Sequence, residues 1–226
     1  MKDTTYIAFD IDGTIYDSSE IIVDAYHRGI RNYMEKHGNP GISIPGYREL
    51  VGVVGIPVEE IFTTLFPGLG REAQREIGGL CNDAFVEIIG KGGGRVFGHV
   101  HSTMESLSRT GYVMLAASNG RKEYVEIILR SFDLMKYFSP PFIYTGPGIP
   151  DKVAIVARYK EKVSGDNLLI MIGDRYTDRD AALKNKIPFI GCAFGHAGES
   201  EIAGSRWIVR GFDEIPGVIA KVAGEV

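Results

Sequence analysis

The chain has 226 residues, of which 44% are hydrophobic, and its formal net charge at pH 7 is -4. That length and composition suffice for one sizeable core, or for a core with a smaller inserted domain. The slight acidity and the lack of clustered basic residues disfavour a nucleic-acid partner. The two cysteines, Cys81 and Cys192, are far apart, as expected for buried or idle thiols in a reducing cytoplasm. Only about four apolar residues precede Asp10, too few for a signal-peptide core or a membrane span, so we expect a cytoplasmic protein without a membrane partner.

Apolar, β-rich segments alternate with helical patterns through most of the chain. We expect strands at Tyr6–Phe9, Tyr112–Ala116, Phe142–Tyr144, Leu168–Ile172, Phe189–Gly191 and Trp207–Val209. We expect helices at Lys122–Phe132, Val153–Lys162, Arg179–Lys184 and Glu214–Val222. This order predicts an α/β fold whose core is a Rossmann-like parallel sheet.

The segment from Ser18 to about Arg95 departs from this alternation. Helical patterns follow one another at Glu20–His37, Val58–Phe66 and Glu72–Ile89, with no convincing strand between them. We therefore expect a discontinuous core of residues 1–17 and 96–226 and an inserted α-helical cap domain of residues 18–95. The return passage, Lys91–Arg95, contains three glycines. It suits a flexible hinge better than a phosphate-binding loop, because no strand precedes it and no Lys-Ser/Thr pair follows.

Two carboxylates directly follow the first predicted strand. Asp10 and Asp12 stand at i and i+2 where that strand ends, so both can point the same way, and Gly13–Thr14 permits a tight turn. In open α/β sheets, ligands bind beyond the carboxyl ends of the strands. One carboxylate can then meet an electrophile while the other transfers a proton. Taken alone, the motif is equally consistent with a strand leading into an ordinary Asp-Gly turn.

Three later positions are expected at the same edge of the sheet. Ser118–Gly120 ends a predicted core strand and opens a helix, so its hydroxyl and backbone amides suit a phosphoryl oxygen, although such segments are usually turns or caps. Lys152 opens another helix, where most lysines are solvated. Asp174 ends a further strand and Asp178 follows four residues later. Such a pair can bind a divalent cation, or Asp178 can simply cap the helix.

In this order, the motifs resemble those of the haloacid dehalogenase superfamily. That family carries Asp-x-Asp-Gly-Thr, a strand-end Ser/Thr, a Lys and Gly-Asp-x-x-x-Asp, and all four stand in this chain with the expected spacing. The helical insert resembles the family's first type of cap domain, and Ala193–Glu199 resembles the loop after its fifth strand. The resemblance thus covers nearly the whole chain. One departure is Arg175, which follows Asp174 where relatives often carry a small residue.

The resemblance implies roles for five residues in phosphoryl transfer. Asp10 would attack phosphorus and form an aspartyl-phosphate. Asp12 would protonate the leaving oxygen and then take a proton from the hydrolytic water. Ser118, with the backbone amide of Asn119, would hold a phosphoryl oxygen. Lys152 would offset negative charge on the phosphate and on Asp10.

The resemblance also implies a magnesium cofactor. The Asp10 carboxylate, the Asp12 carbonyl and Asp174 would bind Mg²⁺, and Asp178 would support the site. Two carboxylates about 5 Å apart repel each other by roughly 3 kcal/mol at an effective dielectric constant of about 20, so a cation is needed before a phosphate dianion enters.

An acid at position 12 favours cleavage of a C–O–P linkage, because the family's dehalogenase and phosphonate-hydrolysing branches do not keep it. Tyr47–Pro57 and Asp151–Val153 look most like phosphoglycolate phosphatases and the related pyrophosphatases and nucleotidases. We therefore expect a phosphatase for a small phosphorylated metabolite, monomeric or homodimeric, with Arg48 contacting the far end of the substrate. A pyrophosphatase or 5'-nucleotidase, a phosphomutase of the β-phosphoglucomutase type and a non-catalytic interaction module are the alternatives. Loss of a motif acid would mark the last of these, and none is lost.

The five histidines do not enter this assignment. His99 and His101 stand at i and i+2 and could suggest zinc. Because no third ligand lies nearby in the sequence, surface or cap roles are favoured for them.

Overall fold

The computed structural model describes residues 4–38, 41–163, 165 and 167–225. Its core is a five-stranded parallel sheet in the order β4-β1-β5-β6-β7. The strands are β1 (Thr5–Phe9), β4 (Val113–Ala116), β5 (Leu168–Gly173), β6 (Phe189–Cys192) and β7 (Trp207–Val209). The predicted α/β fold with a Rossmann-like parallel sheet is confirmed.

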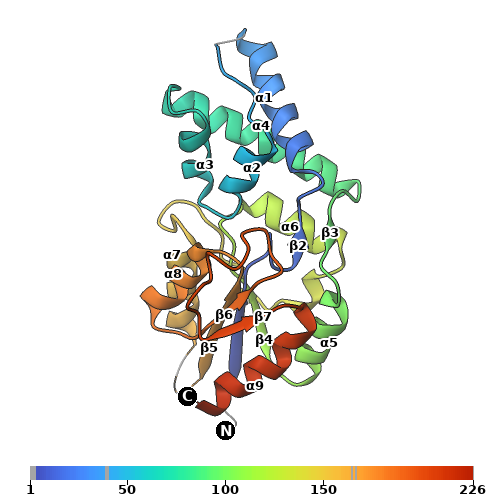
Figure 1. Cartoon of the computed structure of the whole chain (residues 1–226), viewed down its shortest axis with the longest axis vertical. Coiled ribbons are helices and arrows are strands. Elements are labelled where there is room, and N and C mark those ends of the chain that lie inside the picture. Colours follow the sequence, from blue (N-terminus) through green and yellow to red (C-terminus); the bar gives the residue numbers. More distant parts are fainter. Residues whose placement is uncertain (1–3, 39–40, 164, 166, 226) are drawn as a thin grey trace.

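Helices cover both faces of this sheet (Figure 1). They are α5 (Val100–Arg109), α6 (Lys122–Ser131), α7 (Lys152–Lys162), α8 (Tyr176–Asn185) and α9 (Ile215–Glu225), with short 3-10 turns η1 (Met135–Tyr137) and η2 (Phe212–Glu214). Successive strand residues point to opposite faces. Ala8 and Met171 accordingly pack with α7 and α8, whereas Ile7 and Phe9 pack with α5, α6 and α9. Burial on both faces explains why the strands read as continuous apolar runs.

A second group of helices lies beyond one end of the sheet, at the top of Figure 1. It consists of α1 (Ile22–His37), α2 (Tyr47–Val53), α3 (Val58–Leu65) and α4 (Arg71–Gly90). Aromatic rings pack it together: Tyr26 lies 5.4 Å from Phe85 and 6.0 Å from Phe62 between ring centroids. The inserted helical cap is therefore confirmed as part of the fold. Its limits, 18–95, stay a prediction, and residues 1–3, 39–40, 164, 166 and 226 of the predicted core and cap ranges lie outside the described residues.

Two short antiparallel strands connect the core to the cap. They are β2 (Tyr16–Asp17) and β3 (Arg95–Val96). The Tyr16 hydroxyl donates to the Gly93 carbonyl at 2.8 Å. Gly94 has φ +72°, and a Cβ there would overlap the Tyr16 hydroxyl, so both the backbone and the contact require glycine. That this connector acts as a hinge stays a prediction.

The structure corrects one predicted strand and adds two helices. Residues 142–144 form no strand, because only Phe138 bridges to Met114 and the prolines at 140 and 141 have no N–H for a ladder. The helices α2 and α5, of seven and ten residues, were not among those predicted. Helix α8 begins three residues before the predicted start, since the Asp178 carboxylate accepts the Arg175 N–H at 2.9 Å and caps the first turn. Within the described ranges, no helix is both long and apolar enough to span a membrane.

Candidate active site

The motif residues meet at the carboxyl ends of three neighbouring strands. Asp10 follows the last residue of β1, Asp174 follows the last residue of β5, and Ser118 lies just after β4. The pairing continues past the strand ends, because the Asp10 N–H donates to the Ile172 carbonyl at 2.9 Å. Since β4, β1 and β5 are adjacent in the sheet, segments more than 100 residues apart in the sequence converge at this edge.

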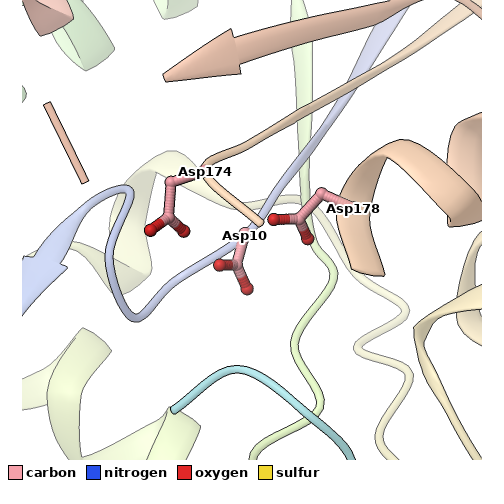
Figure 2. Close-up of side chains that lie close together, drawn as sticks. All are labelled: Asp10, Asp174 and Asp178. Atoms are coloured by element: carbon pink, nitrogen blue, oxygen red, sulfur yellow. The ribbon is translucent and has the colours of Figure 1, made fainter. Parts of the chain in front are cut away.

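Three buried carboxylates converge here, as Figure 2 shows for Asp10, Asp174 and Asp178. One oxygen from each lies within 4.8 Å of the others. Burial disfavours the charged form and raises the pKa of Asp10 and of Asp174 from 3.8 to about 6. Burial likewise raises the pKa of Asp178 to about 7. The cluster therefore needs positive charge if all three groups are to ionise together.

Lys152 supplies part of that charge. Its Nζ lies 2.7 Å from Asp10 Oδ1 and also donates to Asp178 Oδ1. The Asp151 carboxylate accepts the Ala154 N–H at 2.9 Å, which caps α7 and fixes where Lys152 enters the site. Burial acts to lower the pKa of the Lys152 ammonium, but the two carboxylates outweigh it and raise that pKa, so the lysine stays charged.

The carboxylate oxygens that remain available fit a divalent cation. Asp10 Oδ2 and Asp174 Oδ1 are buried, and neither accepts a hydrogen bond from the described part of the chain. The other oxygen of Asp174 accepts the His196 N–H at 2.8 Å, and both oxygens of Asp178 already accept hydrogen bonds. Small hard cations such as Mg²⁺ bind such carboxylate oxygens. The donor set thus fits Mg²⁺ on Asp10 and Asp174, with Asp178 holding the lysine.

The Asp12 carboxylate has partners that the sequence analysis missed. Tyr124 of α6 donates its hydroxyl to Asp12 Oδ2 at 2.7 Å. His196 Nδ1 lies 3.7 Å from Asp12 Oδ1, and its Nε2 lies 3.0 Å from Asp17 Oδ1. Burial lowers the pKa of His196, but the carboxylates around it outweigh burial and raise it. No motif marks Tyr124; for His196, the only signal was its place in the segment resembling the loop after the fifth strand.

Ser118 and Asn119 both lie at the site, but their side chains do different things. The Ser118 hydroxyl accepts the Gly120 N–H at 3.0 Å and lines the cavity described below. The Asn119 side chain accepts the Lys152 N–H at 2.7 Å and donates to the Gly55 carbonyl at 2.9 Å. Asn119 therefore joins the start of α7 to the cap, and its predicted role in phosphate binding concerns its backbone amide.

Arg175 contacts the cap. Its guanidinium donates to the Val54 carbonyl, and its Nε lies 2.8 Å from a carboxylate oxygen of Glu201. The Thr177 hydroxyl donates to the next cap carbonyl, that of Gly55, at 3.2 Å. The residue that departs from the family pattern thus holds the loop between α2 and α3 against the core.

A cavity of about 80 Å³ extends from Asp10 and Asp12 toward the cap. The cap side of its wall is largely apolar, formed by Ile22, Tyr26, Val54, Ile56, Val58, Ile61, Phe62 and Phe85. Ser18, Asn82 and Arg121 add polar groups. Arg48, which the sequence analysis proposed for substrate binding, is exposed on α2 and is not among the residues that line the cavity.

Comparisons with known proteins find relatives over most of the chain. A family model described as haloacid dehalogenase-like hydrolase matches residues 7–192. A phosphoglycolate phosphatase of Vibrio parahaemolyticus is 23% identical, with 97% of each chain covered. A 5'-nucleotidase of Pseudomonas aeruginosa is 24% identical, with 87% of this chain and 86% of the relative covered. The crystal structure of a predicted phosphatase from Clostridium acetobutylicum has a TM-score of 0.81 at 25% identity and covers 97% of this chain and 100% of its own.

Proposed function

The chain belongs to the haloacid dehalogenase-like hydrolases and is a phosphatase, and we propose that it hydrolyses small phosphomonoesters with Mg²⁺ through an aspartyl-phosphate on Asp10. One observation carries the proposal. Lys152 binds one oxygen of the buried Asp10 carboxylate, while the other oxygen has no hydrogen-bond partner among the described residues. A carboxylate held by a lysine in this way, at the end of a strand and beside a cavity, can bind a cation through one oxygen and attack phosphorus with the other.

The reaction has two halves. In the first, an Asp10 oxygen bonds to phosphorus as the bond to the leaving oxygen breaks, and Asp12 gives that oxygen a proton. In the second, Asp12 takes a proton from water as the water oxygen attacks phosphorus, which releases phosphate and restores Asp10. The Tyr124 hydroxyl binds Asp12 Oδ2 and so fixes the orientation of the acid for both steps.

Other residues would handle the negative charge. Lys152 and the donors at Ser118 and the Asn119 backbone would stabilise phosphoryl oxygens. When bound, Mg²⁺ would neutralise part of the charge on the phosphate and the carboxylates, and the Asp10 and Asp174 carboxylates and the Asp12 carbonyl would hold it, supported by Asp178.

The cap limits the size of the substrate. It contacts the core next to the site through Asn119–Gly55 and Arg175–Val54 hydrogen bonds, so water can be excluded during phosphoryl transfer. A lid of this kind closes over small molecules, which supports a soluble metabolite as the substrate. The described cysteines, Cys81 and Cys192, are both free and buried, which supports a cytoplasmic location. We propose a monomer or a homodimer there.

A 5'-nucleotidase is the second candidate. The Pseudomonas aeruginosa relative bears that name, and the rings of Tyr26, Phe62 and Phe85 line the cavity, where a base could stack. The relatives named phosphoglycolate phosphatase favour a smaller substrate.

A substrate screen tests the proposal. Purified protein would be assayed for phosphate release from phosphoglycolate, sugar phosphates, nucleoside monophosphates and pyrophosphate, with Mg²⁺ and after exhaustive chelation. We expect hydrolysis of a small ester only with the metal, and a phosphoryl group on the peptide that contains Asp10 in acid-quenched samples analysed by mass spectrometry. Full activity after chelation would reject the metal assignment, and inactivity toward every ester would reject the function.

A further inference from the structure

Within the part of the chain that the structure describes, Arg121 is the only lysine or arginine among the residues that line the cavity. It precedes the first residue of α6 in the core, yet its side chain reaches α4 of the cap. A Cβ at Gly78 would lie 3.2 Å from Arg121 Nη2, and a Cβ at Gly79 would lie 3.8 Å from Nη1. The guanidinium therefore lies over two successive glycines in the middle of α4.

Those glycines weaken the helix. Glycine in a helix interior is less favourable than alanine by about 1 kcal/mol. At Gly78 the reason is contact, because a Cβ there would lie 2.9 Å from the Phe62 ring as well as against the guanidinium. The two glycines that lower the stability of α4 thus stand where the Arg121 guanidinium packs against it. This indicates that α4 is built to accommodate the guanidinium at this position.

Arg121 has no ion pair with any carboxylate in the described ranges. In contrast, Nζ of its neighbour Lys122 lies 3.9 Å from Glu126 Oε1. Three surface arginines also pair with a carboxylate, namely Arg28, Arg109 and Arg130. Arg121 is partly buried against an apolar wall. A cation in such surroundings is stabilised when an anion enters beside it.

Two further polar groups line the same cavity. The Ser18 hydroxyl is buried and has no hydrogen-bond partner among the described residues, and Asn82 of α4 adds a side-chain amide. A guanidinium binds a carboxylate through two parallel hydrogen bonds, and a hydroxyl or an amide can donate to the same group. The cavity is small, about 80 Å³, and its lining contains both the catalytic aspartates and this group.

We propose that the enzyme prefers short phosphorylated hydroxy acids, with the phosphate at Asp10 and the substrate carboxylate at Arg121. This inference rests on the proposed phosphatase function. The uncharged alkyl or aryl group of another ester would pack against the apolar residues of the cavity, but it would leave the Arg121 guanidinium without an anion to bind.

Two esters of similar size separate these cases. Phosphoglycolate and ethyl phosphate differ mainly in the carboxylate, so the ratio of their kcat/KM values measures its recognition. We expect the wild type to favour phosphoglycolate and Arg121→Gln to lower that ratio about 10- to 100-fold, the range for losing a charge-assisted hydrogen bond. Lys122→Gln, which removes an adjacent cation outside the cavity, is the matched control and should leave the ratio unchanged.

Further measurements keep the test decisive. If Arg121→Gln does not fold by circular dichroism, Arg121→Lys keeps the charge without the guanidinium fork and should give an intermediate ratio. Equal losses on both esters, or a wild type that favours ethyl phosphate or a nucleoside monophosphate, would overturn the inference. If the enzyme hydrolyses p-nitrophenyl phosphate but does not prefer phosphoglycolate to ethyl phosphate, the inference about Arg121 is overturned while the proposed phosphatase function stands. Inactivity toward all of these esters with Mg²⁺ would instead overturn the proposed function.

Discussion

The cavity has two walls of opposite character. On the core side, Asp10 and Asp12 line the cavity, and Asp10 belongs to a buried group of charges with Asp174, Asp178 and Lys152, which hydrogen bonds hold at strand ends and helix starts. On the cap side, apolar residues of α1, α3 and α4 form the wall, with few polar groups among them. The buried charges on the core side shift one another's pKa values and can take part in the reaction. The apolar residues on the cap side can only determine which substrates bind. Changes to the two walls should therefore have different kinetic signatures.

The largest effect is expected at Asp10. The Asp10→Asn variant keeps the shape of the side chain but loses the charge and the nucleophilic oxygen, so turnover of small phosphomonoesters should fall by about 10⁴-fold or more. Steady-state phosphate release measures this, and circular dichroism checks that the fold is retained. Turnover at the wild-type rate by the purified variant would show that another group attacks phosphorus.

Asp12→Ala should separate the two roles of that acid. A general acid matters most when the leaving group is poor, so phosphorylation of the enzyme by an alkyl phosphate should slow by about 10²- to 10⁴-fold. With p-nitrophenyl phosphate the first step should slow much less, because this leaving group needs no proton. Single-turnover experiments measure the step directly, and equal losses with both esters would argue against an acid role for Asp12.

The buried carboxylates should make the metal-free protein sensitive to pH. The pKa values of Asp10 and Asp174, about 6, and of Asp178, about 7, lie above the ordinary 3.8, so the folded state holds protons more tightly than the unfolded state. Stability in EDTA should therefore fall as the pH rises from about 4 to about 7.

Magnesium should reverse this trend. It binds the folded state, and the ionised carboxylates bind it best, so the gain in melting temperature should be several degrees at pH 7.5 and small at pH 5. Thermal unfolding with EDTA and with Mg²⁺ at both pH values tests this. The same gain at the two pH values would place the metal away from the carboxylates.

The smallest effect is expected where the two walls meet. Arg175→Ala removes the hydrogen bond to the Val54 carbonyl and the ion pair with Glu201 but leaves every motif acid in place. Loss of these contacts should loosen the cap and raise KM up to about 10-fold, with less change in the phosphorylation rate. Arg179→Ala on the same helix is the control, since its guanidinium donates to the Ala203 carbonyl of the core and not to the cap within the described residues. Equal effects of the two variants would mean that the contact with the cap is not functional.

The sequence predicted the core wall better than the cap wall, for a physical reason. Strand ends place Asp10 and Asp174 at one edge whatever the side chains around them, so motif spacing was sufficient to bring them together. Lys152 also lies where the motif predicted, although most lysines at helix starts are solvated.

Contacts that depend on the path of the cap could not be read from the sequence. Arg48 was predicted to contact the far end of the substrate, yet it is exposed on a helix of seven residues, too short to show a clear period. Tyr124, His196 and Arg121 reach the site from a helix face, a loop and a helix start, and each position is set by packing between distant segments. The strand predicted at 142–144 does not form, because the prolines next to it have no backbone N–H to donate to a neighbouring strand.

The pairing of β2 with β3 has a consequence for how such an enzyme can diversify. The chain leaves the core and returns to it through two antiparallel segments, whose paired Cα atoms lie about 5 Å apart in such a ladder. All five strands of the main sheet lie outside the stretch between them. The helices of the cap are thus inserted into the core at a single point and can be exchanged as a unit. A different module joined to the same two ends would meet the same carboxylates, so selection can alter substrate range by replacement while the reaction is inherited intact.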